Sequence, residues 1–361
     1  MRRRLWVGLD VGADQMTTCV IDDRGETVLE ESIPTDAKEL HTVLRPYKRR
    51  TGLIGMEAGS HSIHLARKLR RLGYRVAMFD TRQASRFLAI RRNKTDANDA
   101  RGLAEIARLG REAVSEVRVK SPECQRLRST LVSRRKLVQL RVATESTIRS
   151  LFRINGGRLK SSYSAASLRR NVSEQLLYLR KSERVDLTSE VQPLVDLCVA
   201  MRSYLEKVDD QLKAKAEEIS VCRRFLEIPG VGPICALSFY SAIEEPSRFS
   251  RNADVGAYLG MVPRVRQSGR STQRLRISKM GCAMTRTQLV TAAMVHLRCS
   301  KSDLQSWGAS LEERTGKLRA QMAVARKLAT VMTAMWKSGE AYQPFRSNPG
   351  KAVIVPVPAT N

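Results

Sequence analysis

The sequence lacks any apolar run long enough to cross a membrane, and it contains few aromatic residues. None of its uninterrupted apolar runs reaches the roughly 18 residues of a transmembrane helix. Three arginines at the N-terminus are followed only by the short apolar run 5–9, which ends at Asp10, so we expect no signal peptide. Aromatic residues make up 5% of the chain. A basic helix lying on a membrane needs exposed aromatics, so we expect no membrane partner.

Cysteine motifs are also missing. The chain has seven cysteines, an odd number, with no Cys-x-x-Cys pair and no histidine at zinc-finger spacing. We therefore expect reduced, mostly packed thiols and a cytoplasmic protein.

The chain instead has a large excess of positive charge. The 361 residues include 64 Lys and Arg against 36 Asp and Glu, which gives a net charge of 64 − 36 = +28. Hydrophobic residues make up 42%, enough to bury a core, so a wholly disordered basic protein is excluded. Self-repulsion of this size indicates a polyanionic partner, and nucleic acid is the first candidate.

The N-terminal third alternates strand and helix patterns. We predict strands at 5–11, 17–21, 26–33, 53–57 and 74–79, and helices starting near 37 and spanning 60–72 and 96–109. This βββαβαβα order predicts a mixed sheet with the ribonuclease-H-like, or RuvC-like, fold over residues 1–112.

The rest of the chain reads as mostly helical. Residues 113–222 form a basic helical region, with seventeen Lys or Arg against four Glu over 118–184. Apolar residues then alternate steps of four and three, the spacing of a short coiled-coil seam that packs against a partner helix or the first basic helix: Leu194, Cys198, Met201, Leu205, Val208 and Leu212. We expect a second compact, mostly helical domain over 223–345 and a loose tail over 346–361.

Four carboxylates are candidates for a metal site. Asp10 and Glu57 end two strands that are expected to finish on the same side of the sheet, and Asp96 and Asp99 share one helix face. Taken singly, Asp96 is better explained as a helix N-cap and Asp10 as a turn residue. Taken together in this cationic chain, hard oxygen donors predict Mg²⁺, with Mn²⁺ as the alternative ion, and phosphodiester chemistry.

The segment 263–279 combines cations with a serine. It contains six Lys or Arg and no acidic residue, with Ser268 followed by Gly269 at a bend. Ser268 is either a nucleophile stabilised by guanidinium groups or a hydrogen-bond donor in a phosphate-binding loop, and composition does not separate the two. Ser271 lies close by, and we prefer Ser268 because it directly precedes the glycine.

A glycine turn at 226–233 could hold a DNA phosphate through its backbone N–H groups, or simply join two helices. The residues expected to contact nucleic acid are Lys94, Gly230, Gly232, Arg264, Arg266, Arg270, Arg274, Arg276 and Lys279.

Seven motifs, in order, resemble the landmarks of the DEDD transposases of bacterial insertion sequences, the insertion-sequence one-hundred-ten group of bridge-RNA-guided serine recombinases. They are Gly8-Leu9-Asp10-Val11-Gly12, Gly55-Met56-Glu57-Ala58, Lys94-Thr95-Asp96-Ala97-Asn98-Asp99-Ala100, Ile228-Pro229-Gly230-Val231-Gly232, Tyr258-Leu259-Gly260, Gln267-Ser268-Gly269 and Arg276-Ile277-Ser278-Lys279-Met280-Gly281.

The resemblance implies an RNA-guided transposase that cuts and rejoins donor and target double-stranded DNA. It implies Mg²⁺ held by Asp10, Glu57, Asp96 and Asp99, and a phosphoserine intermediate on Ser268. It also implies a noncoding bridge RNA and homodimers that assemble into tetramers. The helical middle, 161–194, is longer than in the shorter members of this family. Dependence on a bridge RNA is therefore the property that the resemblance implies least directly for this chain.

Three other functions account for part of the sequence. A RuvC-like structure-specific nuclease would use metal-activated water and form no covalent intermediate. An actin-like or sugar-kinase ATPase would need a second phosphate loop and an adenosine motif, which we do not find. A non-enzymatic nucleic-acid-binding protein fits the charge but leaves the four carboxylates unexplained.

Overall fold

The computed structural model describes residues 4–90, 93–110, 112–268 and 271–345. The chain divides into two compact units, Met1–Ser121 and Pro122–Asn361. Among the helices in these described ranges, none is both long and apolar enough to cross a membrane.

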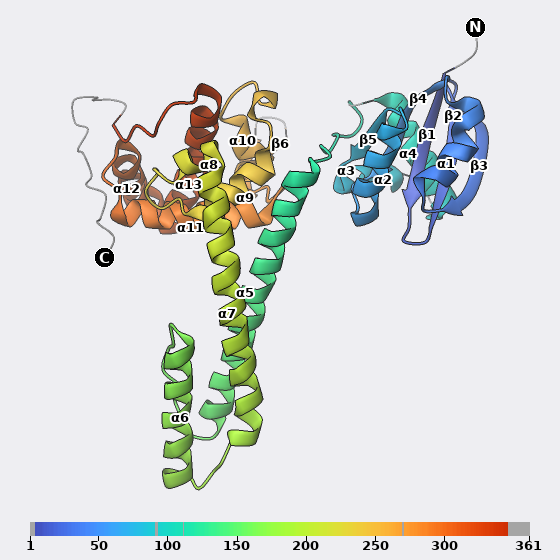
Figure 1. Cartoon of the computed structure of the whole chain (residues 1–361). Coiled ribbons are helices and arrows are strands. Elements are labelled where there is room, and N and C mark those ends of the chain that lie inside the picture. The colour runs from blue at the N-terminus through green and yellow to red at the C-terminus, as the bar shows by residue number, and fades with distance from the viewer. Residues whose placement is uncertain (1–3, 91–92, 111, 269–270, 346–361) are drawn as a thin grey trace. The chain divides into compact units, whose positions relative to one another are not determined.

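The first unit is built on one mixed sheet of five strands in the order β3-β2-β1-β4-β5 (Figure 1). The strands are β1 (Leu5–Val11), β2 (Gln15–Asp22), β3 (Thr27–Pro34), β4 (Thr51–Glu57) and β5 (Val76–Phe79). The first three form an antiparallel meander, whereas β4 and β5 run parallel to β1. The predicted α/β sheet is therefore confirmed, with strand ends within a few residues of those expected.

Helices flank this sheet. They are α1 (Ala37–Leu44), a short 3₁₀ helix at Arg45–Tyr47, α2 (Ser60–Arg71), α3 (Thr81–Leu88) and α4 (Asp96–Leu109). Helix α3 was not predicted. It begins where the Asp80 side chain accepts a hydrogen bond from the Gln83 backbone N–H, an ordinary N-cap that a sequence pattern of only eight residues does not reveal.

Helix α4 packs directly on the backbone of the two central strands. Gly8 of β1 and Gly55 of β4 are register partners. A Cβ atom at Gly8 would lie 1.9 Å from the Ala100 carbonyl oxygen, and one at Gly55 would lie 2.4 Å from the Phe79 ring and 3.1 Å from the Ala107 Cβ. Because neither glycine carries a side chain, the helix can approach the sheet backbone closely at this point.

The second unit contains a long helical arm. Helices α5 (Pro122–Ile154) and α7 (Thr188–Glu218) run antiparallel, with α6 (Ala165–Ser182) at the far end of the arm (Figure 1). The ion pairs between Lys215 and Glu123 (3.7 Å) and between Arg202 and Glu145 (2.7 Å) fix this direction. The apolar seam of α7 therefore packs against the first basic helix, and the buried Ala216 extends this apolar face toward the end of α7.

The remaining helices form the main core of this unit. They are α8 (Ser220–Phe225), α9 (Pro233–Ile243), a 3₁₀ helix at Pro246–Arg248, α10 (Asp254–Tyr258), α11 (Ala283–Cys299), α12 (Asp303–Thr315) and α13 (Lys317–Ser338). Phe225, Phe239 and Leu289 are buried among them. The Arg-rich stretch forms a hairpin of β6 (Pro263–Ser268) and β7 (Ser271–Ile277). The mostly helical C-terminal region is confirmed, although this hairpin was expected only as a non-helical bend.

We expect Gly8→Ala to destabilise the first unit by about 1–3 kcal/mol, because the added methyl collides with backbone atoms of α4 that cannot rotate away. Gly59→Ala is the matched control. Its φ of −131° suits any residue, and its Cβ would meet only the Ser62 hydroxyl at 3.3 Å. Thermal unfolding followed by circular dichroism measures both, and equal melting temperatures for the two variants would contradict the close contact.

Candidate functional site

Two carboxylates stand side by side where the central strands end. In the parallel pairing of β1 with β4, Leu9 is opposite Met56, so the next residues, Asp10 and Glu57, lie one position beyond the last paired residues of these two strands. Side chains alternate along a strand, so Asp10 projects on the same face as Gly8, and Glu57 on the same face as Gly55. Both carboxylates therefore lie on the face that α4 covers.

The first turn of α4 brings the other two carboxylates to the same place. Thr95 is the N-cap, with its side-chain oxygen accepting a hydrogen bond from the Asn98 backbone N–H at 3.2 Å. Asp96 is thus the first helical residue, and the alternative that it caps the helix is wrong. Asp10 lies within β1, so its alternative role as a turn residue is wrong as well.

Asp10, Glu57, Asp96 and Asp99 line one cavity of about 550 Å³. Asp96 is exposed, while Asp10, Glu57 and Asp99 are partly buried. Within the described residues, no three His, Cys, Asp or Glu side chains approach closely enough to share one metal ion. All four predicted carboxylates thus line the same cavity, and their role as metal ligands stays a prediction.

The electrostatics of the cavity disfavour two ionised carboxylates in close proximity. Burial, followed by the negative charges of Asp96 and Asp99, raises the pKa of Asp10. Burial, followed by the charges of Asp10 and Asp99, raises the pKa of Glu57. Like charges in a partly desolvated site make each ionisation harder, and a bound cation would remove that cost.

Lys94 is the cationic side chain among the described residues that line this cavity. Its charge lowers the pKa of both Asp10 and Glu57, although this effect is smaller than the burial that raises them. Its side chain is exposed at the cavity wall, where a phosphate entering the site could reach it.

The opposite wall comes from α3, which sequence reasoning missed. Thr81, Ser85 and Leu88 line the cavity. The Thr81 hydroxyl donates a hydrogen bond to the Ala58 carbonyl oxygen at 3.0 Å, which ties this wall to the residue that follows Glu57. Asp80 followed by Ala84 and Leu88 is a weak signal for this helix, because eight residues are too few to establish a helical period.

Ser268 lies in the second unit, at the last position of β6. It is exposed and paired in register with Ser271, so the strands are joined by two residues, Gly269 and Arg270, which lie outside the described residues. Arg264 and Arg266 stand at alternate positions before Ser268 on the same strand and are exposed. Position 274 pairs with Val265, and its side chain is not among those described.

Tight backbone packing closes the base of this hairpin. A Cβ atom at Gly260 would lie 2.0 Å from the Met280 carbonyl oxygen, and one at Gly281 would lie 2.1 Å from the Tyr258 carbonyl oxygen. Both glycines have positive φ, +70° and +76°. These contacts explain the glycines of two sequence motifs, because they hold the two ends of the hairpin segment together. Arg276 and Lys279 are exposed on this segment.

The glycine turn between α8 and α9 has a structural role. Gly230 has a φ of +92°, and a Cβ there would lie 2.5 Å from the Ala292 carbonyl oxygen of α11. Buried His296 reinforces this contact, with its Nδ1 atom 2.8 Å from the Pro229 carbonyl oxygen. Gly232, in contrast, caps α9 with no atom within 4 Å of where its Cβ would be, so it stays the better phosphate candidate of the two.

We expect Asp10→Asn to raise the melting temperature at pH 7 without divalent cations. A raised carboxyl pKa in the folded state means that ionisation destabilises the fold at neutral pH. That penalty disappears as the pH falls through the folded pKa toward the ordinary value of 3.8. Thermal unfolding from pH 7 to pH 4, with the exposed Asp14→Asn as control, measures the effect. A stabilisation of Asp10→Asn that is absent at pH 7, or that grows on acidification, would contradict it.

Two family models and several known proteins match this chain. Residues 7–154 match a family model described as "Transposase", of the DEDD and IS110 type, and residues 222–307 match one described as "Transposase IS116/IS110/IS902 family". The transposase for insertion sequence element IS1111A of Coxiella burnetii is 30% identical over 344 residues, which cover 93% of this chain and 91% of that protein. The transposase for insertion sequence element IS1328 of Yersinia enterocolitica is 22% identical over 93% of this chain and 98% of its own length. The chain therefore belongs to the IS116/IS110/IS902 family of insertion-sequence transposases, enzymes that cut and rejoin DNA.

Proposed function

We propose that this transposase cuts and rejoins donor and target DNA through a covalent link to Ser268, with divalent metal at the cavity of Asp10, Glu57, Asp96 and Asp99. The observation that carries the proposal is the gathering of these four carboxylates in one cavity, with the pKa values of Asp10 and Glu57 raised by burial and by their neighbours. We further propose that the sheet order and the position of α4 represent a RuvC-like fold.

The donor set of the cavity fits a hard divalent cation. All four ligand candidates are carboxylates, which Mg²⁺ and Mn²⁺ prefer, and no histidine or cysteine lines the cavity within the described residues. Among the described residues no three such side chains already stand close enough to share one ion, so we propose that binding of metal and DNA draws these carboxylates together. When bound, such ions stabilise the negative charge that develops on the phosphodiester.

The chemistry assigned to Ser268 is a transesterification. The Ser268 Oγ atom attacks the scissile phosphorus and forms a phosphoserine, while the bond from phosphorus to the bridging sugar oxygen breaks and that oxygen takes up a proton. A DNA hydroxyl then attacks the same phosphorus and releases the serine. Arg264 and Arg266, exposed along β6, are placed to neutralise the phosphate.

No acidic residue or histidine stands within 263–279 to accept the serine proton. We therefore propose that the carboxylate cavity of a first subunit and the hairpin of a second act on the same phosphodiester, in homodimers that assemble into tetramers. A net charge of +28 supports binding of both DNA and a noncoding bridge RNA. We assign most of these backbone contacts to the basic helices over 118–184, where seventeen Lys or Arg stand against four Glu, together with the stretch 264–279. We keep 1–112 and 223–345 as the two catalytic regions.

The alternative function is a structure-specific nuclease in which metal-activated water attacks the phosphodiester. The same carboxylate cavity favours it, because this cavity alone suffices for that reaction. The two functions differ in one observable, the covalent protein–DNA adduct.

We expect wild-type protein incubated with Mg²⁺, RNA from the element's own flank and end-labelled element DNA to retain label after denaturation. Ser268→Ala should lose at least 99% of the adduct, because the attacking oxygen is gone. Ser271→Ala, which removes the register partner's hydroxyl, should keep it. Chelation with EDTA should abolish the adduct in every variant.

An adduct that survives Ser268→Ala would contradict the assignment of the nucleophile. Cleavage by the wild-type protein with no adduct at all would move the function to the water-using nuclease. Omitting the RNA tests guidance separately: adduct formation that is unchanged without RNA would remove the bridge-RNA part of the proposal and leave the serine chemistry intact.

A further inference from the structure

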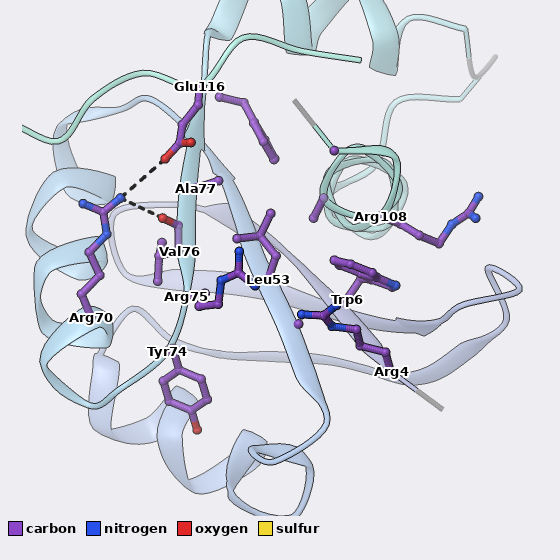
Figure 2. Close-up of a pocket in the computed structure, with 14 residues that line it drawn as sticks. Arg4, Trp6, Leu53, Arg70, Tyr74, Arg75, Val76, Ala77, Arg108 and Glu116 are labelled. Atoms are coloured by element: carbon purple, nitrogen blue, oxygen red, sulfur yellow. Dashed lines mark hydrogen bonds and ion pairs between the residues drawn. The ribbon is translucent and has the colours of Figure 1, made fainter. Parts of the chain in front are cut away.

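A second cavity lies at the other end of α4 and serves neither the carboxylates nor the serine. It has a volume of about 470 Å³ and is formed by the beginnings of β1, β4 and β5 and by the C-terminal end of α4 (Figure 2). Trp6 and Asp10 project on the same face of β1, on either side of Gly8, so the two cavities lie at opposite ends of one helix.

The lining of this cavity combines a flat apolar surface with guanidinium groups. Trp6, Leu53, Ala77, Phe79 and Ala107 supply the apolar part. Four arginines surround it: Arg4, Arg70, Arg75 and Arg108. Glu116 is the one acidic side chain in the described lining. A volume of this size is typical of a small-molecule site.

Two of the four arginines are already engaged. The Arg70 Nη2 atom donates to the Val76 carbonyl oxygen at 2.8 Å and lies 3.8 Å from Glu116, contacts drawn as dashed lines in Figure 2. The Arg108 Nε atom lies 2.8 Å from Glu105. Arg4 and Arg75 are exposed, and within the described ranges no acidic side chain lies within ion-pair distance of either.

The indole of Trp6 also has an unused donor. Its Nε1 atom is buried and has no hydrogen-bond partner among the described residues. The Arg4 guanidinium lies over the ring, 5.3 Å from its centroid. Arg4 also crosses Gly52, where a Cβ atom would lie 2.7 Å from its Nε atom. The planar indole of Trp6 and the guanidinium of Arg4 thus lie together in the lining of this cavity.

We propose that this cavity binds one unpaired nucleotide of a nucleic-acid strand. The base would lie against Trp6 and the apolar lining, since aromatic and guanidinium planes are the usual stacking partners of unpaired bases. The flanking phosphates would pair with Arg4 and Arg75, whose guanidinium groups match phosphate geometry. A double-stranded segment cannot enter, because its bases are stacked and paired. This inference depends on neither the metal nor the serine chemistry.

Binding measured in EDTA with the full chain tests the proposal. Fluorescence anisotropy at one fixed salt concentration would compare a U12 RNA strand, a T12 DNA strand and a 12-base-pair duplex. The double variant Arg4→Ser/Arg75→Ser is matched by Arg49→Ser/Arg71→Ser, which removes the same charge from exposed positions of the same unit outside the cavity.

We expect Arg4→Ser/Arg75→Ser to weaken binding of at least one single strand about tenfold relative to the control pair, with duplex binding within about twofold of that control. Trp6→Leu should weaken single-strand binding similarly, and Trp6→Phe should largely preserve it. The strand that loses more affinity identifies the sugar of the occupant. Equal losses for the cavity variant and the control, or equal losses on single strands and duplex, would overturn the proposal even if Trp6→Leu fails to fold.

Discussion

The direct contact between α4 and the backbone of β1 is the constraint on which the first unit depends. At Gly8 the helix backbone comes so close that a single methyl group would meet the Ala100 carbonyl oxygen at 1.9 Å. This contact sets the height and the register of α4, and it therefore places Asp96 and Asp99 over the strand ends that carry Asp10 and Glu57. The same helix separates the carboxylate cavity from the arginine-lined one. One packing contact between small residues thus positions two sites of opposite charge.

Much of this could be predicted from the sequence because the relevant signals are local. The short apolar runs of β1 and β4 and the three-residue spacing of Asp96 and Asp99 need no knowledge of distant contacts. The structure confirms the strands, and the four carboxylates line one cavity. Helix α3 and the β6–β7 hairpin were missed for physical reasons. A helix of eight residues has too few turns to show a period. The hairpin is exposed along all of β6, so it has no buried face to produce alternation.

Other features depend on contacts that no sequence pattern contains. Gly230 was considered for phosphate binding, yet the structure gives it a packing role against α11, which lies some sixty residues further along the chain. The arginine-lined cavity brings together Arg4, just before β1, Arg75, just before β5, and Arg108, near the end of α4, and the spacing of these residues in the sequence does not predict it. The net charge of +28 was a useful global signal, because it indicates a polyanionic partner independently of the fold, and transposases act on DNA.

The central claim is that the carboxylate cavity beneath α4 holds the divalent cation of a transposase. Crystals of the full chain grown with Mn²⁺ and measured at a wavelength where manganese scatters anomalously would test it most directly, because the signal locates the ion without relying on activity. The account predicts an anomalous peak among Asp10, Glu57, Asp96 and Asp99, and its loss in Asp10→Asn. Ordered Mn²⁺ elsewhere on the protein with none in this cavity would contradict it.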